Sequence, residues 1–150
     1  MRTLCTSRID VGQFDWLNQH QLTAVSRREC DWVFSFSDGV SLVVACLWRL
    51  IDHGRIKRAN PDDGHQFGLP APVDAERELN ELIGKSRLVA VELRDGTLDL
   101  RLTFENGRVL EIIPDSSGYE AWTLQRADQQ YIAVGGGSLA VWETNPKNRA

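Results

Sequence analysis

The sequence repeats one short pattern, first in residues 22–50 and again in residues 88–124. Both copies end with a tryptophan that is followed two positions later by a leucine. Each copy is typical of two strands, a tight turn and a third strand, so the sequence predicts a duplicated antiparallel β-meander. Three pairs of segments carry the repeat: 22–25 with 88–91, 34–39 with 102–107, and 48–50 with 122–124.

Alternation of apolar and polar residues supports the strands of both copies. Residues 32–36 and 98–104 alternate with a period of two, which is typical of a strand with one buried face. Asp-Gly at 38–39 and Asn-Gly at 106–107 supply turns, because glycine adopts a positive φ without steric cost. The apolar run 40–51 predicts either one central strand or two strands joined by a bend.

One segment, residues 74–83, has the pattern of an amphipathic helix. Asp74 is suited to cap its first turn, Gly84 is suited to end it, and its apolar residues form one stripe. Many short strands with one helix predict an α+β domain that is mainly antiparallel β. We expect residues 1–150 to form a single domain, in which the two meanders build a curled sheet or open barrel and the helix covers one opening.

Charge and apolar content argue against two classes of partner. The net charge is −4, and the basic cluster Arg55, Lys57 and Arg58 is followed closely by Asp62 and Asp63. Nucleic-acid binding requires clustered lysine and arginine, so we expect no nucleic-acid partner. The longest apolar run is only of strand length, so we expect no membrane-spanning segment and no membrane partner.

The cysteines and the acidic loop give no sign of a metal or a cofactor. Cys5, Cys30 and Cys46 are odd in number and lack C-x-x-C spacing. We expect small core residues in a reducing compartment, which indicates the cytoplasm. The acidic loop at 62–65 has no second histidine nearby, so we expect no metal there and no cofactor.

The glycine run at 135–137 precedes a predicted strand, and no lysine follows it closely. A phosphate loop needs a helix at that point, so the run favours a bulge, or a close backbone approach to another strand or to Trp122. The chain has no Gly-x-Ser-x-Gly motif, and its sequence places no cation beside Cys30 or Cys46. The sequence therefore predicts no catalytic residue.

The five tryptophans divide into two groups. Trp32, Trp48 and Trp122 occupy strand positions that predict core residues, whereas Trp16 and Trp142 lie nearer the ends, where a rim or interface is expected.

Two glutamates flank the turn at 114–118. If their strands bring Glu111 and Glu120 face to face, they form a carboxylate pair suited to acid–base chemistry. Otherwise they are two separate residues that face solvent.

The second half of the chain contains the stretch Asp-Ser-Ser-Gly-Tyr-Glu-Ala-Trp at 115–122, preceded by Leu-Glu-Ile at 110–112 and followed by the three glycines. With these motifs, residues 88–142 resemble a family of small uncharacterised bacterial proteins, some of them similar to polymorphic-toxin immunity proteins. The resemblance implies a bacterial cytoplasmic protein that works by binding, and it transfers no catalytic residue. It marks four binding-site candidates: Glu111, Tyr119, Glu120 and Trp122.

Three hypotheses follow. The first is a non-enzymatic binding protein that neutralises a toxin or regulates a partner, since an acidic surface suits a basic partner such as a nuclease toxin. The second is a small-molecule binder or enzyme with a carboxylate-lined pocket between the repeats, lined by Glu111, Tyr119 and Glu120. The third is a homodimer formed through an exposed sheet face or edge.

Overall fold

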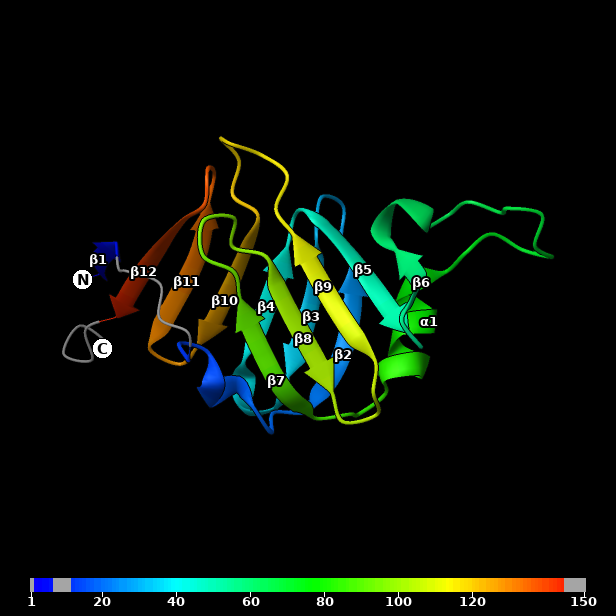
Figure 1. The fold of residues 1–150 in the computed structure, drawn as a ribbon, viewed down its shortest axis with the longest axis horizontal. Helices are drawn as coiled ribbons and strands as arrows, with labels where there is room; N and C mark the ends of the chain where they lie inside the picture. The colour runs from blue at the N-terminus through cyan, green and yellow to red at the C-terminus, as the bar shows by residue number, and fades with distance from the viewer. Residues whose placement is uncertain (1, 7–11, 145–150) are drawn as a thin grey trace.

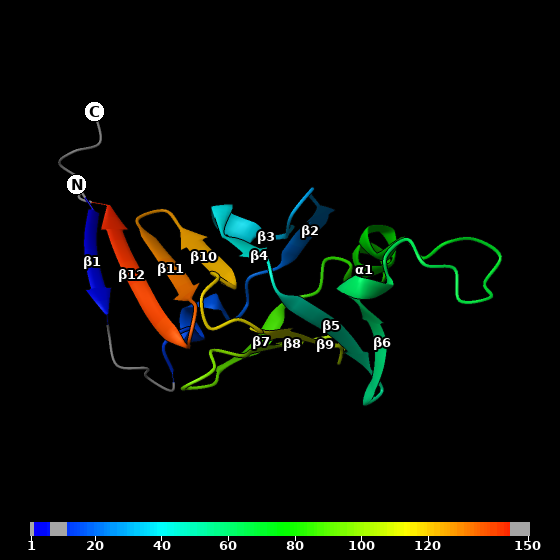
Figure 2. The same cartoon turned by 90° about the horizontal axis from the view of Figure 1, so that it is seen from above.

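Two antiparallel sheets form the body of the protein and lie against each other as two layers (Figures 1 and 2). The computed structural model describes residues 2–6 and 12–144. The seven-stranded sheet contains, in spatial order, β1 (Arg2–Thr6), β12 (Ser138–Thr144), β11 (Gln129–Val134), β10 (Trp122–Arg126), β4 (Ser41–Val44), β3 (Trp32–Phe36) and β2 (Leu22–Arg27). The five-stranded sheet contains β6 (Arg55–Ala59), β5 (Leu47–Asp52), β9 (Val109–Ile113), β8 (Leu100–Phe104) and β7 (Leu88–Leu93).

This arrangement confirms the α+β fold built mainly from antiparallel strands. The sheet is curled, and in the described residues the strands do not close into a barrel. The expected helix is α1 (Ala75–Ile83), which lies at one end of the molecule (Figure 1). The described chain otherwise has only single turns of 3-10 helix, at Asp15–Leu17, Ser37–Gly39 and Asn60–Asp62.

Each sheet is built from strands of both repeated segments. Strands β2, β3 and β4 form a meander in one sheet, and the chain then crosses at residues 45–46 into the other sheet as β5, which pairs with β9. Strands β7, β8 and β9 form the second meander, and the chain crosses back through residues 114–121 as β10, which pairs with β4. The run 40–51 is thus two strands joined by a bend, and the bend changes sheets.

The strand registers correspond between the two halves. Trp48 on β5 is opposite Ile112 on β9, and Trp122 on β10 is opposite Val44 on β4. The first strand of each meander also has a register shift at the same place, between Leu22 and Ala24 in β2 and between Leu88 and Ala90 in β7. The two segments therefore share a backbone plan, while their descent from one duplicated unit stays a prediction.

The core between the sheets contains the tryptophans predicted for it. Trp32, Trp48 and Trp122 are buried, and the segment before β2 docks on the core through Phe14 and Leu17. Cys46 is buried as expected. The expectation for Cys30 was wrong: it is exposed, because it lies in the turn between β2 and β3 rather than on a strand.

Helix α1 covers the free edge of β2 as well as packing on the core. The Asp74 carboxylate accepts a hydrogen bond from the Arg77 backbone N–H and so caps the helix as predicted. The Asn80 side chain accepts a bond from Val25 N–H (2.9 Å) and donates one to Val25 C=O (2.8 Å). Glu76 accepts another from Arg27 N–H at 2.7 Å. The helix thus satisfies backbone groups that an edge strand leaves unpaired.

Candidate functional site

Three connecting segments, residues 94–99, 114–121 and 135–137, meet at the end of the molecule where the chain crosses from β9 to β10. A Cβ placed on Gly135 would lie 2.4 Å from the backbone of Gly118, and one on Gly137 would lie 1.9 Å from the carbonyl oxygen of Gly96. The glycine run therefore permits close backbone packing, as predicted, although its neighbours are connecting loops rather than a strand or Trp122.

Trp122 holds one of these segments in place. Its side chain is 1 % exposed, and its Nε1–H donates to the carbonyl oxygen of Leu98 at 2.9 Å. Leu98 has a φ of +64°, a backbone conformation that is unfavourable for a branched side chain and needs support from its surroundings. Trp122 is thus a positioning residue beneath the site, and its buried ring does not reach a partner at the surface.

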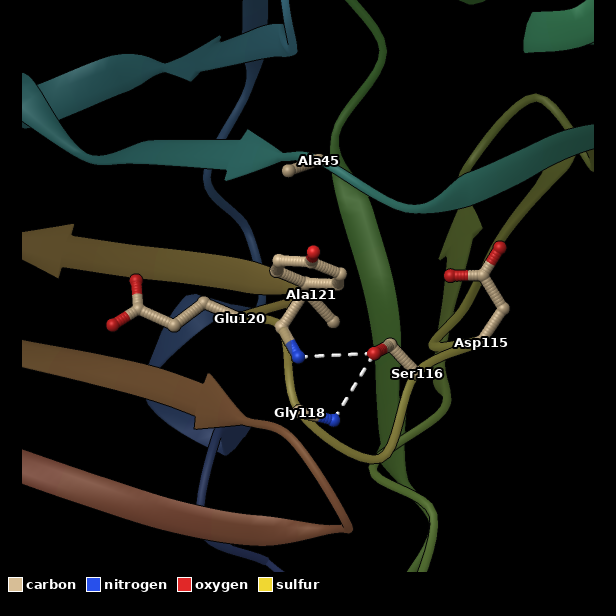
Figure 3. Close-up of a pocket in the computed structure, with 7 residues that line it drawn as sticks. Ala45, Asp115, Ser116, Gly118, Glu120 and Ala121 are labelled. Carbon is tan, nitrogen blue, oxygen red and sulfur yellow. Dashed lines mark hydrogen bonds between the residues drawn. The ribbon is translucent and has the colours of Figure 1, made fainter.

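The 114–121 loop is held by the hydroxyl of Ser116. Its Oγ accepts hydrogen bonds from the backbone N–H of Gly118 (3.0 Å) and of Tyr119 (2.9 Å) (Figure 3). At the end of the loop, Ala121 donates its N–H to Ala133 C=O on β11 and accepts from the N–H of Ala45 in the first crossover, so the loop is tied to both. Residues 119–121 therefore belong to this fixed loop, and β10 begins only at Trp122.

A hollow of about 620 Å³ lies against this loop. Asp115 and Glu120 lie on opposite sides of it (Figure 3), and neither carboxylate forms an ion pair within the described part of the chain. The side chain of Tyr119 lines the same hollow and is 83 % exposed. The remaining lining residues are small or polar, namely Ala45, Ser116, Gly118 and Ala121.

A second, smaller hollow of about 260 Å³ adjoins the first, and Ser116, Tyr119 and Ala121 line both. Its remaining wall is formed largely by glycine backbone and apolar residues from the three segments and from the end of β11. These residues are Gly96, Thr97, Leu98, Pro114, Ser117, Ala133, Val134, Gly136 and Gly137.

Glu111 lies elsewhere, on the outer face of the five-stranded sheet. Its carboxylate accepts a hydrogen bond from Arg49 Nε at 2.7 Å and lies 3.4 Å from Arg101, which in turn lies 3.5 Å from Glu92. These four side chains form a row of alternating charge across β5, β9, β8 and β7. The structure therefore brings Tyr119 and Glu120 together with Asp115 and does not bring Glu111 to them.

The sequence pattern does not mark Asp115, because Asp115 lies in the crossover loop outside the predicted strands. The two repeats differ most in length at their crossovers, two residues at 45–46 against eight at 114–121. Comparing the copies for insertions would have marked the whole longer loop, including Asp115.

Two other groups of reactive side chains, the Cys46 thiol and the carboxylates of the acidic loop, are engaged within the structure. Burial, followed by the negative charge of Asp115, raises the pKa of the Cys46 thiol to about 12, so this thiol is protonated at neutral pH and is a poor nucleophile. In the acidic loop, Asp63 accepts from Ala75 N–H and pairs with Arg27 at 2.8 Å, while Asp62 accepts from Ala59 N–H. Among the described residues, no three His, Cys, Asp or Glu side chains are grouped as metal ligands.

A second exposed surface is the loop at 64–73, which projects beyond α1 (Figure 1). Its base is closed by hydrogen bonds from Gly64 N–H to Val73 C=O (2.8 Å) and from Val73 N–H to His65 C=O (2.7 Å). Phe67 at its tip is 65 % exposed, stacks on the His65 ring and has a φ of +47°. An exposed aromatic ring in a strained, fixed loop is a candidate contact for another protein.

Comparison with known proteins gives a family and no activity. Within the described residues, no helix has the length and apolar character needed to cross a membrane. No curated protein and no solved structure matches the chain. A family model does match residues 14–143, which include both repeated segments and all three segments of the hollow. The chain therefore belongs to DUF6188, a family of unknown function.

Proposed function

We propose that this protein is a non-enzymatic binding protein that recognises a basic protein, as a toxin-neutralising immunity protein would, in the bacterial cytoplasm. The observation that carries the proposal is the presentation of Tyr119. Its ring is 83 % exposed, yet its backbone is fixed by Ser116 and by the packing of Gly118 on Gly135. Because its backbone is already held, Tyr119 loses less backbone entropy on binding than it would in a free loop, and tyrosines often dominate interface energetics.

Charge supports a basic partner. Asp115 and Glu120 border the same hollow without intramolecular ion pairs in the described residues, and the whole chain carries a net charge of −4. Unpaired carboxylates around an exposed aromatic ring favour a lysine or arginine of the partner and speed its association.

A binding role is further supported by the state of the reactive groups. The Cys46 thiol is buried with a raised pKa, and Glu111 is engaged by two arginines instead of facing Glu120. The pair of Glu111 and Glu120 that the acid–base hypothesis named is therefore not assembled around the hollow.

Site-specific photo-crosslinking in cells of the native host tests the proposal. A photoreactive phenylalanine analogue replaces Tyr119, and in a parallel strain it replaces Glu105, an exposed residue of the β8–β9 turn, which lies at the other end of β9 from the 114–121 loop. We expect a crosslink to a protein of basic isoelectric point from position 119 only. A variant that carries the photoreactive residue at position 119 together with Asp115→Asn and Glu120→Gln should give that crosslink in much lower yield.

Two outcomes contradict the proposal. The first is an equal crosslinking pattern at positions 119 and 105, which indicates random collision. The second is a small molecule retained at the hollow in native mass spectrometry and lost in Tyr119→Ala, which favours the ligand-binding hypothesis, because the volume lies within the range of ligand pockets. If the crosslinked protein is toxic when expressed alone, restored growth on co-expression establishes neutralisation.

A further inference from the structure

The two adjoining hollows differ in chemistry, and their arrangement limits what can occupy them together. One is bordered by the carboxylates of Asp115 and Glu120, and the other is walled by glycine backbone and apolar side chains. We infer that they jointly bind a short extended segment of a partner, in which an arginine or lysine stands next to an apolar residue. This inference rests on the proposed function for the partner being a protein.

The basic residue is assigned to the larger hollow by charge complementarity. Neither Asp115 nor Glu120 has an intramolecular cation in the described structure, so both carboxylates are available to a guanidinium or ammonium group. Tyr119 adds an aromatic face to the same hollow, and such a face attracts a cation. An acidic residue in this position would meet two like charges.

The apolar residue is assigned to the smaller hollow by its lining. Pro114 and Val134 contribute partly exposed apolar atoms, and Gly96 and Gly136 have no side chain to keep a partner's backbone away. Glycine at these positions therefore allows the close approach that an extended chain needs. Here the glycines serve both the packing of the loops and the shape of the surface.

A single segment can use both hollows because they share a wall. Ser116, Tyr119 and Ala121 line each of them, so adjacent residues of one chain can be accommodated without a gap. Neighbouring side chains of an extended peptide point to opposite sides, with about 3.3 Å between residues. A basic and an apolar residue in sequence can thus lie on the two sides of Tyr119.

The test uses amide NMR spectra of the isotope-labelled full-length chain. The probes are N-acetyl-Leu-Arg-amide, its acidic analogue N-acetyl-Leu-Glu-amide, and N-acetyl-Gly-Arg-amide, each added at millimolar concentration. We expect Leu-Arg to shift the amide signals of Tyr119 and Glu120 together with those of Gly96 and Gly136. Gly-Arg should shift the first pair alone, and Leu-Glu should shift neither pair.

A matched variant checks the charge requirement. In Asp115→Asn with Glu120→Gln, affinity for Leu-Arg should fall by about threefold to tenfold, as expected for losing two exposed ion pairs. The spectrum without peptide should stay unchanged outside the 114–121 loop, which shows that the fold is intact.

The inference is overturned if Leu-Glu shifts the same amides as Leu-Arg, or if the shifts from Leu-Arg lie outside the two hollows. It is also overturned if Leu-Arg produces no shift. None of these results decides whether the photo-crosslink from position 119 forms, so the two proposals are tested independently. A specific crosslink without a peptide effect means that the partner binds at Tyr119 through a different chemistry.

Discussion

The side-chain amide of Asn80 replaces the hydrogen bonds that a neighbouring strand would give to β2. It accepts from the N–H of Val25 and donates to the C=O of the same residue. Replacement by leucine keeps similar bulk but leaves both backbone groups at a half-buried edge without a partner. We expect Asn80→Leu to lower the free energy of unfolding by about 1–3 kcal/mol, the usual range for an unsatisfied buried group.

Urea unfolding measures this change. Glu81→Gln is the control, since Glu81 lies on the exposed side of the same helix, 3.4 Å from Arg77, and an exposed pair contributes about 0–1 kcal/mol. Equal stabilities for the wild type and Asn80→Leu would mean that the bonds to Val25 contribute nothing.

Cys46 gives stability a dependence on alkaline pH. Its pKa is raised from 9.0 to about 12 in the folded chain, first by burial and then by the charge of Asp115. Between pH 9 and pH 12 the unfolded chain therefore loses the thiol proton while the folded chain keeps it. Stability falls as pH rises through this window, with a slope of up to about 1.4 kcal/mol per pH unit from this group.

Denaturant unfolding across that pH range separates the contribution of Cys46. In Cys46→Ala, the decline in stability should be shallower than in the wild type, whatever the stability at neutral pH. If stability declines with the same slope in the wild type and in Cys46→Ala, the Cys46 thiol does not hold its proton to a higher pH in the folded chain than in the unfolded chain.

At the scale of elements, the loops of the hollow depend on an asymmetry between two glycines in contact. A Cβ on Gly135 would lie 2.4 Å from the Gly118 backbone, whereas a Cβ on Gly118 would meet no atom within 4 Å. We expect Gly135→Ala to lower the free energy of unfolding by about 1–3 kcal/mol through overpacking, and to displace the 114–121 loop.

Gly118→Ala is the matched control and should stay within about 0.5 kcal/mol of the wild type. Amide NMR spectra report the loop directly, through the signals of Tyr119 and Glu120. If both variants are equally stable and leave those signals in place, the backbone contact between the two loops is not needed.

Elements with local signals were predictable from the sequence, and elements that depend on distant partners were not. Asp74 caps the start of α1 with its side chain, and Gly84 ends the helix with its positive φ. Gly107 has the positive φ expected of the Asn-Gly turn. By contrast, β1 is defined by its pairing with β12 from the other end of the chain, and the pattern of residues 2–6 does not predict a strand.

The candidate site was predictable only in part, for the same reason. Tyr119 and Glu120 share a hollow because they share a loop, whereas Glu111 precedes that loop on a strand. Which face of β9 points outward depends on its register with β5 and β8. The resemblance marked Trp122 as a binding-site candidate, but its position on β10 opposite Val44 places it in the core, as its strand position predicted.

For the whole molecule, the exchange of strands makes each half incomplete without the other. The first half lacks β9 and β10, and the second lacks β4 and β5. We expect fragments 1–67 and 68–150, cut at the exposed tip of the 64–73 loop, to be unfolded separately. Mixed together they should recover the β-sheet circular dichroism and the cooperative unfolding of the intact chain.

The comparison is made at equal concentration for each fragment and for the mixture. A variant of the second fragment with Trp122→Ala serves as the control, because it loses a core residue opposite Val44 and should reassociate poorly. Cooperative unfolding of either fragment on its own would show that one meander is sufficient to fold.

The order of synthesis adds a consequence to this exchange. Strands β4 and β5 leave the ribosome before β10 and β9, the strands that pair with them. Until then, β4 and β5 each have an edge of unpaired backbone N–H and C=O groups, and such edges pair readily with other chains. On a polysome, the neighbouring nascent chain supplies strands of the same sequence, which fit those edges equally well. We therefore expect strand exchange between nascent chains to compete with the folding of each single chain.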